Sequence, residues 1–135
     1  MSDLVDLSAV EQRRMIGTKA VSATELLDAH LDRIGQCNET VNAIVGMNAD
    51  IGRQRAAVID AAIAAGEPVG PLAGLVTAHK DLTETVDFPS TMGAVAFVGR
   101  FAPADSLLVA RVRDAGAVAI GKTNVPEFGA GSHTT

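Results

Sequence analysis

The segment from Asp105 to Ile120 most constrains the fold, because it passes from a helix directly into an apolar strand. Asp105 is a typical N-cap residue and Gly116 a typical residue at a helix C-terminus. Apolar residues recur between them: Leu107, Leu108, Ala110, Val112 and Ala115. Ala117 to Ile120 then has the pattern of a buried strand. A helix leading into such a strand is half of a parallel-sheet unit, so we expect an α/β fold.

A partner strand is predicted from Leu75 to His79. It follows residues 70–74, whose glycines and proline rule out a helical continuation. The looser segment Thr83 to Pro103 is expected to hold one short strand or helix, around Ala94 to Val98. With only two or three strands predicted, the sheet should be the first part of a mixed sheet in an α/β/α sandwich.

Residues 1–66 are predicted to form a helical leader, and residues 67–135 the first strands and the crossover helix. The first helix follows the candidate caps Ser2 and Asp3 and should end near Gly17. Three helices are thus expected before the first clear strand.

The second helix should begin at Ser22, which forms a capping box with Glu25, and end at Gly35. The third should run from Asn48 or Asp50 to Ala65, before Gly66 and Pro68. Between them, the short apolar run 41–45 does not decide between strand and helix.

Composition restricts the class of protein. The 135 residues are 47% hydrophobic and 20% charged, which suits one modest globular domain. No apolar run reaches the roughly 20 residues that span a bilayer, and the N-terminus lacks a signal-peptide pattern, so we expect a soluble, cytoplasmic protein without a membrane partner. A net charge of -5 without a basic cluster argues against nucleic acid as a partner.

Metal and disulfide sites are not expected. Cys37 is the only cysteine, which excludes an internal disulfide and a multi-cysteine zinc site. The three histidines, His30, His79 and His133, do not have metal-ligand spacing.

Residues 116–123 match the spacing G-x-x-x-x-G-K-[ST] of a phosphate-binding loop. Such a loop follows a strand and opens a helix, so that backbone N–H groups converge on phosphate. Here a helix precedes Gly116 and the intervening residues are strand formers, so nucleotide binding is disfavoured.

Lys80 is the candidate catalytic residue, because it stands at the end of a short apolar run. Burial there would disfavour the ammonium ion and yield a neutral amine able to take a proton from a serine. The alternative is an exposed lysine at a strand end that reaches water or pairs with Asp81 or Glu84, and the local sequence alone favours that alternative.

The second half of the chain resembles the amidase signature family. The order Gly-Pro-Leu-x-Gly, a short apolar run and Lys-Asp is matched by Gly70 to Asp81, and Thr-x-Gly by residues 91–93. Asp-x-x-x-Val, then Arg, Ala-Gly-Ala and Gly-Lys-Thr-Asn-x-Pro-Glu-Phe are matched from Asp105 to Phe128. These separate matches, in the right order, favour an N-terminal fragment of such an enzyme.

The resemblance implies hydrolysis of a small-molecule carboxamide through a Ser-cis-Ser-Lys triad, without metal or organic cofactor. Lys80 would be the base, but both serines belong to a signature that this chain lacks, so the isolated chain should be inactive. Ser132 matches a segment before that signature and is not assigned a catalytic role. The resemblance leaves open whether the full-length protein forms a homodimer.

Two other functions remain open: a glutamine-hydrolysing component of an amidotransferase, and a non-catalytic α/β interaction module. Four residues of the last matched motif are expected to have local roles only. Gly121 should provide a turn out of the strand, Lys122 should be solvated or pair locally, and Asn124 should cap a short helix carrying Glu127.

Overall fold

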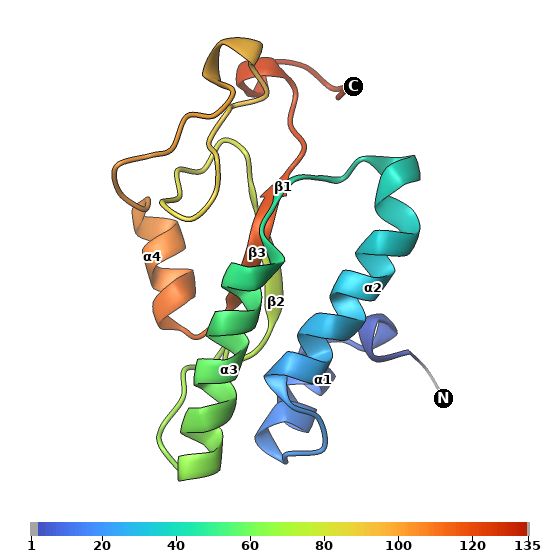
Figure 1. Cartoon of the computed structure of the whole chain (residues 1–135), viewed down its shortest axis with the longest axis vertical. Helices are drawn as coiled ribbons and strands as arrows, with labels where there is room; N and C mark the ends of the chain where they lie inside the picture. Colours follow the sequence, from blue (N-terminus) through green and yellow to red (C-terminus); the bar gives the residue numbers. More distant parts are fainter. Residues whose placement is uncertain (1–2, 135) are drawn as a thin grey trace.

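A three-stranded sheet lies between helices in the computed structural model, which describes residues 3–134. The α-helices are α1 (Ala9–Gly17), α2 (Ala23–Val41), α3 (Ala49–Ala65) and α4 (Leu107–Asp114), and the strands are β1 (Ile44–Met47), β2 (Val76–Lys80) and β3 (Val118–Thr123). Three short 3-10 helices complete the fold: η1 (Leu4–Asp6), η2 (Val95–Phe97) and η3 (Glu127–Gly129). Helices α2 and α3 lie on one side of the sheet and α4 on the other (Figure 1).

The sheet has the order β1-β3-β2. β2 runs parallel to β3, with Val76 opposite Val118 and Lys80 opposite Thr123, which confirms the predicted parallel pair. β1 runs antiparallel to β3, so the sheet is mixed. The expectation of three helices before the first strand is wrong, because β1 lies between α2 and α3 and pairs with a strand more than 70 residues later. The end of the short apolar run 41–45, which the sequence left open between strand and helix, therefore becomes a strand only through this distant pairing.

Helix α1 begins later than the sequence predicts. Ser8 is its N-cap, with its side chain accepting a hydrogen bond from the Glu11 N–H at 3.2 Å. The earlier residues Leu4–Asp6 form η1 instead, and Ser2 lies outside the described residues.

Helix α2 has the predicted capping box at its start but does not end at Gly35. A glycine inside a helix costs only about 1 kcal/mol, which the long amphipathic helix tolerates. The helix continues to Val41 and is capped by Asn42, which adopts a left-handed conformation. The Asn38 side chain both donates to the Ile44 carbonyl at 2.9 Å and accepts from its N–H at 2.8 Å, so it directs the chain into β1.

Helices α3 and α4 follow the predicted ranges closely. Asn48 caps α3 and Gly66 ends it in a left-handed conformation. At α4 the cap is Ser106 rather than Asp105. The Asp105 carboxylate accepts a hydrogen bond from the Val86 N–H at 2.9 Å and pairs with Arg113 at 2.5 Å, so tertiary contacts take the side chain expected to cap the helix.

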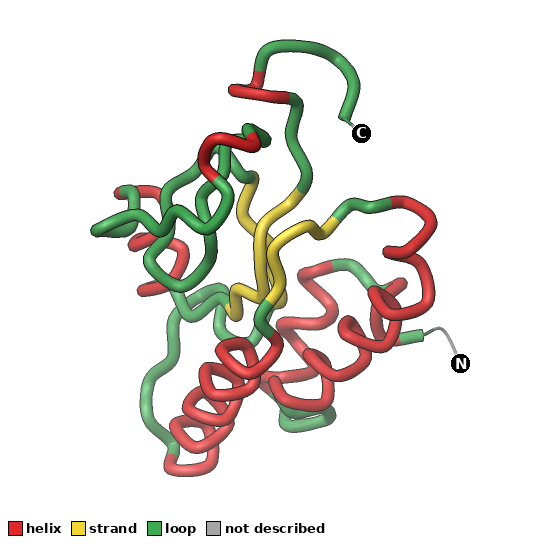
Figure 2. The backbone as a smooth tube through the Cα atoms, turned by 45° about the horizontal axis from the view of Figure 1, so that its top comes forward, coloured by secondary structure: helices red, strands yellow, loops and turns green. Residues whose placement is uncertain are grey.

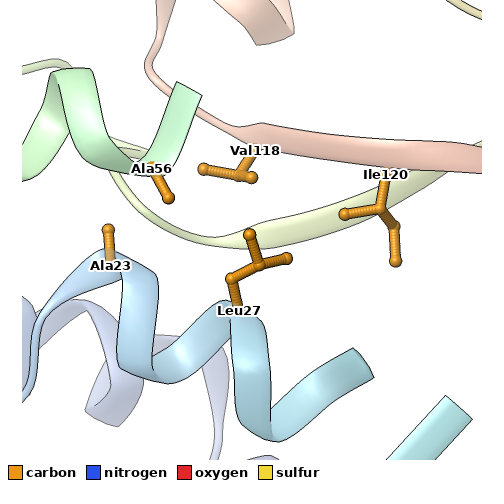
Figure 3. Close-up of a cluster of buried hydrophobic side chains, with 5 residues drawn as sticks. All are labelled: Ala23, Leu27, Ala56, Val118 and Ile120. Atoms are coloured by element: carbon orange, nitrogen blue, oxygen red, sulfur yellow. The ribbon is translucent and has the colours of Figure 1, made fainter. Parts of the chain in front are cut away.

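The main core joins α2 and α3 to β3. It consists of Ala23, Leu27, Ala56, Val118 and Ile120, all with at most 2% of their surface exposed (Figure 3). α3 approaches β3 at Gly52, where an added Cβ would lie 3.0 Å from Ile120 Cγ2. This packing is the reason that the helical first part and the sheet form one unit.

The other side of the sheet carries α4 and the long β2–α4 connection. Figure 2 shows these loops gathered away from α1, α2 and α3, beside the ends of the strands. Several large apolar side chains there are exposed, among them Val95 at 88%, Val98 at 75% and Leu107 at 68%. No helix within residues 3–134 is long and apolar enough to cross a membrane.

Candidate active site

Lys80 is the last residue of β2 and its side chain is exposed. Within residues 3–134 it is therefore exposed, as the local sequence favours, and not buried as the catalytic hypothesis requires. The reason is that β2 is an edge strand of the described sheet, so no further strand lies beside it. The alternative partners are also occupied: Asp81 contacts Lys122, and Glu84 contacts Arg100 at 2.5 Å. Lys80 thus stands unpaired with any carboxylate of the described chain, at the carboxyl end of a parallel strand.

The backbone around Lys80 is held from two sides. The Asp81 N–H donates to the Thr123 carbonyl at 3.2 Å, which extends the β2–β3 pairing by one residue. The Thr83 N–H donates to the Lys80 carbonyl at 2.8 Å and closes a turn directly after the strand.

Lys122, and not Lys80, is the buried lysine of this chain. The residue has 0% of its surface exposed and pairs with Asp81, 41 positions earlier in the chain, so it is neither solvated nor paired locally as the sequence suggested. The Nζ atom donates to the Thr83 carbonyl at 2.6 Å and to Ser90 Oγ at 3.2 Å, and lies 3.2 Å from Asp81 Oδ1. A buried ammonium needs such a complete set of partners, because it has lost its water.

An irregularity in β3 directs Lys122 to this position. From Thr77 to His79 the strand β2 advances by two residues, whereas β3 advances by three, from Ala119 to Lys122. Side chains alternate along a strand, so the extra residue moves Lys122 to the face that carries His79. Without this bulge the lysine would point to the side of the sheet that packs on α2 and α3.

Asp81 connects Lys122 to the loop at Thr91. The Asp81 carboxylate accepts hydrogen bonds from the Thr91 N–H, at 3.0 and 3.2 Å from its two oxygens, and from the Thr91 hydroxyl. Thr91 Oγ1 in turn accepts from the Gly93 N–H at 3.2 Å. The three sequence segments 80–81, 91–93 and 121–123, which lie far apart in the chain, therefore meet at one end of the sheet.

A hollow of about 200 Å³ lies beside this cluster. Asp81, Thr91 and Gly93 form part of its wall, together with Val45 and Asn124. Lys80 is thus exposed at the end of β2, and the next residue, Asp81, forms the buried ion pair with Lys122 and also borders the hollow.

A family comparison covers the segments that form this site. The Amidase family model matches residues 25–135, which is most of the chain and includes all three segments. The chain belongs to the Amidase family. Its N-terminal 24 residues lie outside that match.

Similar curated proteins have one recurrent name. The chain is 45% identical over 134 residues to the A subunit of the glutamyl-tRNA(Gln) amidotransferase of Acidothermus cellulolyticus, and 42% identical to that of Thermobifida fusca. Each alignment covers 99% of the chain but only 26% and 27% of the relative. The chain therefore spans about a quarter of the length of these proteins.

Solved amidase structures share the fold. A peptide amidase from Stenotrophomonas maltophilia is 32% identical, with a TM-score of 0.84 over 91% of this chain and 26% of that enzyme. A bacterial aryl acylamidase of the amidase signature family is 31% identical, with a TM-score of 0.84 over 90% of this chain and 26% of its own. The α/β fold that the motifs implied is thus that of the family.

Other predicted residues of this amidase segment have different roles from those expected. Gly121 does not form a turn but lies inside β3, where an added Cβ would be 2.3 Å from the Gly46 carbonyl oxygen. Asn124 does not cap η3, which Pro126 precedes; its side chain donates to the Asn42 carbonyl at 3.2 Å. Glu127 is the first residue of η3, as the sequence indicates, and no catalytic role is assigned to it.

The phosphate-loop match has the wrong structural context, as the sequence suggests. Gly116 follows the end of α4 with a positive φ of 92°, and Gly121 to Thr123 belong to a strand. Within residues 3–134 no α-helix begins after Lys122 to bind a phosphate, and the lysine itself is buried in an ion pair.

The histidines lie apart from the Lys80 site or face away from it. His79 is half-buried, and burial lowers its pKa, with a further lowering from the charge of Lys122. His133 Nδ1 lies 2.7 Å from Ser132 Oγ, but both residues are exposed. Among the described residues no group of histidine, cysteine or carboxylate side chains could hold a metal ion.

Proposed function

We propose that this chain provides the general base, Lys80, of an enzyme that hydrolyses carboxamides. The observation that carries the proposal is the position of Lys80 at the carboxyl end of β2, where the three motif segments of the family meet. Ligand and active sites of parallel α/β sheets lie at that end of the strands. An amine there can reach a substrate that binds above the sheet edge.

In the proposed reaction the neutral Lys80 amine accepts a proton from a bridging serine, which accepts one from a nucleophilic serine. The nucleophile attacks the amide carbonyl carbon, and the proton held by Lys80 returns through the bridging serine to the leaving nitrogen. The tetrahedral intermediate then expels ammonia or an amine as the C–N bond breaks. Water then hydrolyses the acyl-enzyme ester and restores the serine. Both serines belong to the family signature, and none of the 135 residues forms a Ser-Ser or Gly-Gly-Ser sequence.

The exposure of Lys80 in residues 3–134 defines what the rest of such an enzyme must do. Water around an exposed lysine competes with a serine hydroxyl for contact with the amine. The serine-bearing part of the enzyme therefore has to cover the end of β2 and exclude water from this amine. The exposed apolar residues near the same end, such as Val95 and Val98, are consistent with such a cover.

The names of the similar curated proteins favour glutamine as the amide substrate in this proposal. The curated proteins at 45% and 42% identity over 99% of this chain are amidotransferase A subunits, whereas the solved peptide amidase and aryl acylamidase are at 32% and 31%. We therefore propose hydrolysis of the glutamine side-chain amide, with the ammonia used by a partner protein, ahead of hydrolysis of unrelated carboxamides.

A chimeric enzyme tests the proposal. Residues 1–135 replace the matching segment of the Acidothermus cellulolyticus relative, and ammonia release from glutamine is measured with the native enzyme as reference. The substitution Lys80→Met should lower the rate by about 10²- to 10⁴-fold, the usual contribution of a general base. The control Lys19→Met removes another lysine, between α1 and α2, and should leave the rate within about twofold.

Two results would contradict the catalytic role of Lys80 and of this chain, and a third would exclude glutamine as the substrate. Undiminished hydrolysis by the Lys80→Met chimera would show that another group is the base. A folded but inactive unsubstituted chimera would favour the non-catalytic interaction module instead. Activity on simple carboxamides but not on glutamine would agree with Lys80 as the base and would reject glutamine as the substrate.

A further inference from the structure

We propose that Lys122 is a positioning residue for Lys80, acting through Asp81 and the turn at Thr83. This inference rests on the proposed function of Lys80 and assigns a role to a residue that the sequence suggested to be solvated or paired locally. Lys122 lies on the strand next to Lys80, yet its amine points into the molecule.

The contacts of Lys122 hold both ends of the segment that follows Lys80. Its Nζ donates to the Thr83 carbonyl at 2.6 Å, and the Thr83 N–H donates to the Lys80 carbonyl at 2.8 Å. The same Nζ lies 3.2 Å from the carboxylate of Asp81, the residue directly after Lys80. Lys80 is thus followed by a turn in which Asp81 and Thr83 both contact one buried amine, and this holds the direction of the backbone at Lys80.

A second set of contacts extends to the loop that borders the hollow. Nζ donates to Ser90 Oγ at 3.2 Å, and Asp81 accepts from the N–H and the hydroxyl of Thr91. Movement of Lys122 would therefore shift the end of β2 and the 90–93 loop together. A substrate that binds between them would find the amine of Lys80 at a different distance.

Burial makes this arrangement rigid and sensitive to substitution. Lys122 is 0% exposed and Asp81 2% exposed, so neither charge has water as an alternative partner. Removal of one charge leaves the other buried without a partner and destabilises the fold. Removal of both charges leaves a neutral interior, which costs less stability. This difference separates an effect on stability from an effect on the position of Lys80.

The test uses the same chimera, with glutamine hydrolysis and thermal unfolding measured for each variant. Lys122→Met should lower kcat by about 10- to 100-fold, the cost of a misplaced catalytic group, and leave KM within about twofold because Lys122 does not contact substrate. It should also lower the unfolding temperature. Lys19→Met, another lysine-to-methionine change, should alter neither kcat nor the unfolding temperature.

The double variant Lys122→Met with Asp81→Asn distinguishes positioning from stability. Because no unpaired charge remains buried, the unfolding temperature should rise again toward that of the parent chimera. The contacts from Nζ to Thr83 and Ser90 are still missing, so kcat should stay low. If kcat recovers together with the unfolding temperature, Lys122 is only structural and the inference is wrong.

A milder variant covers the case in which Lys122→Met does not fold. Thr91→Val removes the hydroxyl contact to Asp81 but keeps the size of the side chain, and we expect kcat to fall several-fold at constant KM. Unchanged kcat in Thr91→Val and in a folded Lys122→Met would each overturn the inference. Loss of activity in Lys80→Met together with full activity in these variants would leave the proposed base intact and reject only the role of Lys122.

Discussion

The approach of β1 to β3 at Gly121 predicts a specific effect of a single methyl group. A Cβ added at Gly121 would lie 2.3 Å from the Gly46 carbonyl oxygen and 2.9 Å from Met47 Cα. Both atoms belong to the backbone of β1, so no side chain can rotate away and the strand itself must move. A Cβ added at Gly46, in the partner strand, would only come within 3.7 Å of the Lys122 side chain, an ordinary contact.

The expected magnitude follows from the cost of overpacking. Insertion of a methyl group into well-packed structure costs about 1–3 kcal/mol, and each 1.4 kcal/mol is a tenfold change in an equilibrium. Gly121→Ala should therefore open the β1–β3 pairing about 5- to 150-fold more often. Gly46→Ala should change this opening by less than about twofold, since ordinary contacts accommodate the new methyl group.

Amide hydrogen exchange followed by mass spectrometry measures this opening without requiring a single cooperative unfolding transition. Peptides that cover residues 44–48 and 118–124 report on the pairing, which includes the bonds from Asn48 N–H to Ile120 and from Asn124 N–H to Ala43. A peptide from within α2 is the internal reference and should exchange equally in all variants. Equal exchange of the strand peptides in Gly121→Ala and Gly46→Ala would refute the close approach of the two strands.

Four further outcomes are expected. The isolated 135-residue chain should release no ammonia from simple amides, because it lacks the serine signature; release that Lys80→Ala abolishes would contradict this. The same chain should be poorly soluble or loosely packed, because its sheet edges are open, and sharp two-state thermal unfolding of a monomer would argue against that. Gly35→Ala should slow amide exchange of α2, because Gly35 is inside the helix and an added Cβ meets nothing within 4 Å. The free energy of local opening should rise by about 0.5–1 kcal/mol. Faster exchange would show that the helix breaks at this position. Burial lowers the pKa of His79 and of His30 below the ordinary 6.5, so the unfolded chain binds protons more readily and the folded state should lose stability as pH falls below 6.5. His79→Gln and His30→Gln should each reduce this loss of stability in pH-dependent denaturation. An unchanged pH dependence in both variants would show that neither histidine causes it.

Helix signals in the sequence were reliable where one or two neighbouring residues decide the outcome. The capping box of Ser22 and Glu25 and the glycine stop at Gly66 are both present in the structure. These motifs involve hydrogen bonds within one turn of helix, so the sequence contains all of their partners. At Gly35 and Asp105 the local signal was misleading, because the long amphipathic α2 tolerates a glycine and tertiary contacts recruit the Asp105 carboxylate.

The site shows the same division. The motif segments that meet at the end of β2 could be recognised in the sequence by their order and spacing, and Lys80 could be named from them. Ser90 and Thr83 were missed, because each contributes a single hydrogen bond to Lys122 and neither has a local signature. The only signal for Lys122 was its place in a matched motif, since a lysine in a strand is ordinarily assigned to solvent.

The sequence by itself determined the capped helices, the parallel strand pair and the family to which the motifs point, because each depends on residues that are neighbours or on an apolar run of adequate length. Only the tertiary structure decided that β1 is a strand, that Lys80 is exposed in this segment and that Lys122 is buried. The physical reason is that pairing and burial depend on chain segments 30 to 80 residues away, and that one extra residue in β3 is enough to turn a side chain from one face of the sheet to the other.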